Sequence, residues 1–252
     1  MKMPTSLDAI DTSWTWTTCE DAQWRNGQLG FNTLDTTSEE AWEYSPGRFY
    51  RPLREHTALF IEFSQTPTSK AGILKFVKAY GLLGANDSTK QNWKQSITEM
   101  RDAVAAWRTI EGGASAENLR LVMIRLLPPR FPFKRARARE AMTKSRSELL
   151  EDCKRQLQIF VNRRLATHAT PAQLVLTRNA DFQLTFRPEH LLGAMWLQFA
   201  QAMARNYNIK ICRGCGRPFQ TGAGTNRRAD ATTCKDSCRQ KAYLKQRRGK
   251  QQ

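Results

Sequence analysis

The chain has 252 residues, a formal net charge of +17 and an apolar content of 40%, with 7 Trp and 12 Phe. Length and apolar content together support a packed core and argue against wholesale disorder. The longest apolar stretch, Leu191 to Ala200, is too short to cross a bilayer, so no membrane partner is expected. No signal peptide is expected after Met1, and the expected compartment is therefore the cytoplasm.

The charge is unevenly distributed along the chain. Residues 1–130 hold 15 Lys or Arg and 15 Asp or Glu, residues 131–205 hold 13 and 6, and residues 206–252 hold 12 and 2. The N-terminal half is therefore neutral, and the excess of positive charge lies after it.

The first 50 residues predict short strands and loops packed by aromatic side chains, at Trp14, Trp16, Trp24, Trp42 and Tyr44. From Pro52 the pattern becomes helical. One helix is expected between Ser69 as its cap and Gly81 as its end, and another after Ser88. The second carries an apolar stripe, whose members are Trp93, Ile97, Met100, Val104 and Trp107.

A further helix is expected over residues 116–127. Residues 130–139 are either a basic linker or the first turn of one long helix that runs to about Ala166, with Cys153 on its inward face. A β-hairpin is predicted where Asn179-Ala180-Asp181 separates two apolar runs. Pro188 opens a last helix of the body, whose core face includes Trp196 and Met203.

Four of the six cysteines form two closely spaced pairs, Cys212-x2-Cys215 and Cys234-x3-Cys238. Gly216 supplies the tight turn that such a first pair needs. Positions i and i+4 share one helix face, so we expect Cys234 and Cys238 on a helix capped by Thr233, after a short hairpin around Phe219. Cytoplasmic thiols in this spacing favour a metal site over disulfides.

We therefore predict one structural Zn²⁺ held by all four thiolates, since a complete tetrahedral shell leaves no open position for catalysis. The arrangement is that of a treble-clef zinc module. An iron–sulfur cluster and a redox-active pair are the alternatives.

The segment around and after the second pair is strongly basic. If residues 234–248 form one helix, cations surround its last two turns, and such a polar helix is not a core element. The residues predicted to contact nucleic acid are Arg227, Arg228, Lys235, Arg239, Lys241, Tyr243, Lys245, Arg247 and Arg248. The cations would meet phosphates and Tyr243 would stack on a base. The alternative is a solvated helix, or one packed against the body.

No enzyme signature is evident. The three histidines, His56, His168 and His190, lie outside residues 206–252, and neither a P-loop nor a Gly-x-Ser-x-Gly motif is present. We therefore expect a protein that is not an enzyme.

The C-terminal segment resembles the CGNR-type zinc finger of bacterial proteins, which follows an N-terminal domain called ABATE. The similarity lies in the two cysteine pairs, in Gly216 to Phe219, in Arg228 with Asp230, and in Arg239 to Tyr243, although Cys-Arg-Gln-Lys stands where that family has Cys-Gly-Asn-Arg. Tyr50 to Leu53 and Leu191 to Ala200 are similar to a group of bacterial zinc-ribbon-like proteins. The resemblance implies a role in transcription regulation.

The sequence as a whole predicts an α+β protein. A mainly α body with minor β over residues 1–205 is followed by a small, basic treble-clef zinc module over residues 206–252. The expected function is zinc-dependent binding of nucleic acid by a transcription regulator. DNA is the expected partner, and the helical body is the candidate surface for a protein partner. The alternative is an adaptor that uses its structural zinc as a clip for a partner protein.

Overall fold

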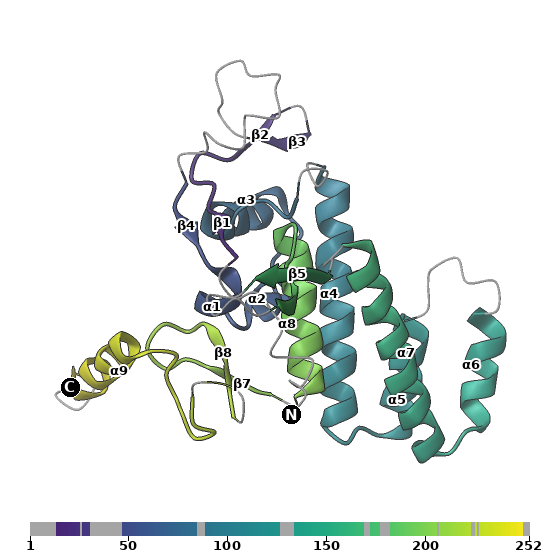
Figure 1. Ribbon diagram of the computed structural model, residues 1–252. Coiled ribbons are helices and arrows are strands. Elements are labelled where there is room, and N and C mark those ends of the chain that lie inside the picture. The colour runs from purple at the N-terminus through teal and green to yellow at the C-terminus, as the bar shows by residue number, and fades with distance from the viewer. Residues whose placement is uncertain are drawn as a thin grey trace.

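A computed structural model describes residues 14–25, 27–30, 47–84, 89–126, 134–168, 172–176, 182–205, 207–222, 225 and 227–248. This part of the chain is mostly helical, and its strands form small antiparallel sheets of two strands each (Figure 1). The predicted α+β class, a helical body with minor β structure, is confirmed.

The N-terminal strands are short, as predicted. β1 (Trp16–Thr17) pairs with β4 (Phe49–Tyr50), and β2 (Gln23–Arg25) pairs with β3 (Gln28–Gly30). The rings of Trp14 and Trp16 stack with their centroids 5.3 Å apart. Trp42 and Tyr44, which were also expected here, lie outside the described residues.

The helices of the body follow in chain order. They are α1 (Pro52–Glu55), α2 (Leu59–Ser64), α3 (Lys70–Tyr80), α4 (Lys90–Glu111), α5 (Ala116–Leu126), α6 (Lys134–Thr143), α7 (Arg146–Thr167) and α8 (Leu191–Ala204). The Ser69 side chain accepts a hydrogen bond from the Gly72 N–H at 3.1 Å, and Gly81, with φ of +90°, ends α3. Both predicted ends of this helix are confirmed.

Two predicted helix boundaries in the body are wrong. Thr89, rather than Ser88, caps α4, because its hydroxyl accepts from the Asn92 N–H at 3.2 Å. The expected single helix to about Ala166 is two helices, α6 and α7. Ser145 separates them by forming a capping box with Glu148, which satisfies the first N–H groups of a new helix.

Helix α8 lies at the centre of the body and packs against α1, α2, α4 and α7 (Figure 1). Its residues from Leu191 to Phe199 are all buried, and the apolar stripe predicted on α4 is buried as well. The buried Gln198 amide donates to the Pro52 carbonyl at 3.0 Å and to the His56 carbonyl at 2.9 Å. These two carbonyls also accept from the His56 and Leu59 N–H groups, so Gln198 gives each a second donor and joins α8 to the segment around α1.

The predicted hairpin is also present. β5 (Ala172–Leu176) and β6 (Phe182–Phe186) pair in antiparallel register, although its turn, residues 179–181, lies outside the described residues. Among the described helices, none combines the length and apolar composition needed to cross a membrane.

The chain ends in β7 (Asn208–Ile211), β8 (Pro218–Thr221) and α9 (Asp236–Arg248), which lie to one side of the body in Figure 1. The predicted boundary between residues 205 and 206 falls in the short connection from α8 to β7. Tyr207, just after it, is buried in the core of the body, and the division into two domains stays a prediction.

Candidate metal centre

The first cysteine pair occupies the turn of the β7–β8 hairpin. Cys212 directly follows β7, and Ile211 pairs with Pro218 at the start of β8. The Gly216 N–H donates to the Cys212 carbonyl at 2.8 Å, and Gly216 adopts a φ of +74°, as its predicted role in a tight turn requires. The hairpin therefore encloses the first pair, whereas the sequence placed it after that pair.

The second pair lies at the start of α9, but only one member is in the helix. Cys238 is in its first turn, and Cys234 precedes its first residue by two positions, so Thr233 does not cap a helix that starts at Cys234. The Cys234 backbone is engaged elsewhere: its N–H donates to the Cys212 sulfur at 3.3 Å, and its carbonyl accepts from Arg227 Nε at 2.8 Å. The bond from Arg227 occupies the carbonyl that would accept the first helical hydrogen bond if the helix started at Cys234.

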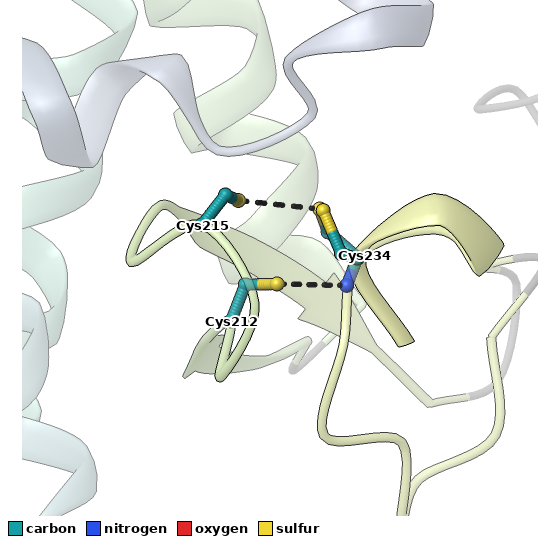
Figure 2. A group of neighbouring side chains, drawn as sticks. Cys212, Cys215 and Cys234 are labelled. Atoms are coloured by element: carbon teal, nitrogen blue, oxygen red, sulfur yellow. Dashed lines mark hydrogen bonds between the residues drawn. The ribbon is translucent and has the colours of Figure 1, made fainter. Parts of the chain in front are cut away.

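The four sulfurs converge on one point. All four Sγ atoms lie within 4.8 Å of one another. The sulfur of Cys234 lies 3.6 Å from that of Cys215 (Figure 2). It also lies 3.6 Å from the sulfur of Cys238. A tetrahedral zinc site with Zn–S bonds of about 2.3 Å has sulfurs about 3.8 Å apart. The cysteines Cys212, Cys215, Cys234 and Cys238 are therefore positioned to bind a metal ion.

The four thiols differ in environment. Burial raises the pKa of Cys212, but hydrogen bonds from the N–H groups of Cys234, Cys215 and Gly214 outweigh it and lower that pKa to about 6. Burial, together with hydrogen bonds between the sulfurs, raises the pKa of Cys234, and burial raises that of Cys238. A metal ion must displace these protons, so its binding is coupled to pH.

A small core surrounds the sulfurs. Cys212, Phe219 and Cys238 are buried together, with Ala231 packed against them. The turn of residues 212–216, called the knuckle below, also lies close against α9. A Cβ on Gly214 would lie 2.3 Å from the Cys238 carbonyl oxygen. Such a core is too small to stabilise a module of this size without a metal or a docking partner.

The residues predicted to contact nucleic acid are mostly on the surface. The exposed ones are Arg228, Lys235, Arg239, Lys241, Tyr243 and Lys245. Arg227 is half-buried; besides its bond to Cys234, its guanidinium lies 5.7 Å from the centre of the Phe219 ring. Arg227 therefore ties the loop to the cysteine centre, a role that the sequence did not predict. The side chains of Arg247 and Arg248 lie outside the described residues.

Arg217 is a further residue that sequence reasoning missed. Its guanidinium lies 5.8 Å from the centre of the Tyr80 ring, and the Tyr80 hydroxyl donates to the Glu62 carboxylate. Burial is the main reason that the pKa of the neighbouring His56 is lowered to about 4, and the positive charge of Arg217 is the next largest cause. Arg217 thus joins the cysteine-bearing segment to the body, and no local pattern marks a contact between residues so far apart in the chain.

The remaining residues singled out by type have places in the body. Cys153 is buried, and its thiol donates to the Leu119 carbonyl at 3.3 Å, which confirms its predicted place in the core. His190 caps α8, with Nδ1 accepting from the Gly193 N–H at 3.0 Å, and lies against His168 with ring centroids 5.7 Å apart.

Comparisons of the chain with protein-family models, with curated proteins and with solved structures found no match.

Proposed function

We propose that this chain is a cytoplasmic, zinc-dependent nucleic-acid-binding protein, and that it acts as a DNA-binding transcription regulator. Residues 206–252 would form a basic treble-clef module on one structural Zn²⁺. The soft thiolate set supports zinc, and its fourfold shell leaves no site for substrate.

The exposure of α9 is the observation that carries this proposal. The helix extends away from the body in Figure 1 and makes no extensive contact with another described helix or strand. Of its side chains in the described part, only Cys238 is buried, while Arg239, Lys241 and Lys245 are exposed. Cations held on a fixed frame bind phosphates and release counterions, whereas cations packed on the body would not.

Titration of fluorescent duplex DNA with the zinc-loaded protein at several salt concentrations tests the proposal. The logarithm of the affinity should fall linearly with the logarithm of salt concentration, with a slope of about −0.9 per phosphate neutralised. Replacing Arg239 and Lys241 by Ala should flatten that slope by up to about 1.8.

The matched control removes two exposed cations from the body instead. Lys154→Ala with Arg155→Ala, on α7, makes the same change in charge and should leave the slope unchanged. The variant Cys215→Ser should lose both the zinc, measured by elemental analysis, and the binding. Equal effects of the two double variants would mean that α9 is not the interface.

One observation favours an adaptor role as the second candidate. Ile211 and Leu244, both in the cysteine-bearing segment, are 58% and 53% exposed. An adaptor would use exposed apolar side chains such as these to contact a protein partner. The adaptor becomes the better description if the zinc-loaded protein binds DNA no more tightly than an unrelated protein of equal charge.

A further inference from the structure

A groove lies between α9 and the loop that precedes it. Its volume is about 410 Å³, and the side chains that line it include Arg213, Thr232, Thr233, Arg239, Tyr243 and Lys245. Arg213 belongs to the knuckle between the first two cysteines, so the groove has one wall from each cysteine pair. The groove is therefore built on the metal centre.

Contacts through the backbone hold the two walls together. The Arg213 N–H donates to the Thr232 carbonyl at 3.0 Å, and Gly214 packs against the carbonyl of Cys238. Cys238 is the direct neighbour of Arg239 in α9. Metal binding at the four sulfurs thus sets the width of the groove, because both walls carry ligands.

The lining combines three cations, two hydroxyls and one aromatic ring. Arg239 and Tyr243 are four residues apart and share one face of α9. The Asp236 Oδ1 lies 3.3 Å from Arg239 Nη2, but both side chains are more than three-quarters exposed. An ion pair so exposed is weak, and Arg239 stays available to a stronger anion. This chemistry suits a phosphate beside a flat, stacking group.

The exposed ring of Tyr243 favours single strands over duplexes. Tyr243 is 62% exposed at its edge, and a groove of this volume admits a group of the size of one nucleotide. A base inside a duplex is stacked on both faces, so it cannot present a face to the tyrosine ring, whereas an unpaired base can.

We infer that this groove binds an unpaired nucleotide of a single-stranded nucleic acid. The base stacks on Tyr243, and Arg213, Arg239 and Lys245 hold the flanking phosphates. The inference rests on the proposed function and narrows it: single strands, or duplexes with an extruded base, become the preferred ligands.

The test compares three labelled ligands by fluorescence anisotropy at equal salt: oligothymidylate and oligouridylate of about 16 nucleotides, and the duplex of the same oligothymidylate with its complement. Zinc-loaded protein should bind the single strands more tightly than the duplex. Tyr243→Ala should lower affinity for single strands by roughly 5- to 150-fold, since one base–aromatic stack is lost, and should leave duplex affinity nearly unchanged. The ratio between the two single strands identifies whether DNA or RNA is the source of the nucleotide.

Two variants make the result specific to the ring. Tyr243→Phe keeps the stacking surface and should bind as the unaltered protein does. Leu244→Ala removes the exposed neighbour on α9, which does not line the groove, and should also bind normally. Equal zinc content in all variants checks that the fold is kept.

Two outcomes would overturn the inference, and they differ in what they leave standing. Salt-dependent binding that is equal for duplex and single strands, and unchanged in Tyr243→Ala, would overturn the groove but keep the proposed function. Binding of no ligand beyond that of an unrelated basic protein would overturn both.

Discussion

Gly214 and Gly216 flank Cys215 in the knuckle and meet different physical demands. Gly214 is constrained by space, because any Cβ there would overlap the Cys238 carbonyl at 2.3 Å. Gly216 is constrained only by its backbone, with a φ of +74° and open space where a Cβ would be. The first glycine lets the two cysteine pairs approach each other, and the second only shapes the turn.

This difference predicts unequal effects of the same substitution. Gly214→Ala should weaken zinc binding severely, because α9 must move away from the knuckle. Gly216→Ala should weaken the free energy of zinc binding by only about 1–2 kcal/mol, the usual penalty for a residue other than glycine in the left-handed conformation. Competition with a chelator measures both affinities, and a Gly214→Ala variant that binds zinc as well as Gly216→Ala would contradict the packing of the knuckle on α9.

His168 is a half-buried base that directly follows α7. Burial is the main reason that the pKa of His168 is lowered to about 4 from its ordinary value of 6.5, and the charges of His190 and Arg164 add to this effect. The unfolded chain therefore takes up a proton at a higher pH than the folded protein does. The stability that His168 contributes is fully present above pH 6.5 and is lost as the pH falls towards 4.

His168→Asn should accordingly flatten the decline of stability in acid. Urea unfolding followed by tryptophan fluorescence gives the free energy of unfolding at each pH for both proteins. Any loss of a bound metal in acid affects both proteins alike, so the difference between the two profiles isolates His168. Parallel profiles between pH 6.5 and 4 would show that the imidazole is not protected from protonation.

At the scale of elements, the break between α6 and α7 shows how one cap outweighs a continuous helical pattern. The Ser145 hydroxyl and the Glu148 side chain each satisfy a backbone N–H of the other's residue. The spacing Ser-x-x-Glu was present in the sequence and would have identified the start of α7. The periodicity of the apolar residues does not reveal this boundary, because two successive helices with different axes can have the same helical period.

Removing the cap should destabilise the body. Ser145→Ala is expected to lower the free energy of unfolding by about 1 kcal/mol, since the first turn of α7 loses its side-chain acceptor. Ser145→Asp keeps an acceptor and should stay within a few tenths of a kcal/mol of the unaltered protein. Urea denaturation compares the three, and equal stability of the Ala and Asp variants would argue against the capping box.

At the scale of the whole molecule, the described part of the basic segment packs on the body through Tyr207 and the β7–β8 hairpin, while α9 makes no extensive contact with the body's described helices and strands. β8 lies against α2, and the Arg217 guanidinium lies over Tyr80, whose hydroxyl in turn bonds Glu62 of α2. Tyr50 completes the contact by donating to the Tyr80 carbonyl at 2.6 Å. The body thereby fixes the hairpin that carries the first cysteine pair.

Arg217→Ala should loosen this docking without removing the metal. The lost cation–π contact is worth about 0.5–2 kcal/mol, and amide hydrogen exchange in α2 and β8 should become faster. Arg213→Ala is the matched control, because it removes the same charge from a residue that lines the groove beside α9. Unchanged exchange in Arg217→Ala would show that other contacts hold the two parts together.

What the sequence determined by itself is local. The grouping of the four cysteines follows from two short spacings, and the stripe on α4 follows from its period. Ser69 and Gly81 bound α3 because caps act within one turn. The tertiary structure alone decided which distant groups meet: the hairpin around the first pair, Arg227 on Cys234, Arg217 on Tyr80, and the groove beside Tyr243. These contacts depend on how whole elements pack, and packing energy is shared among residues that no short window of sequence contains.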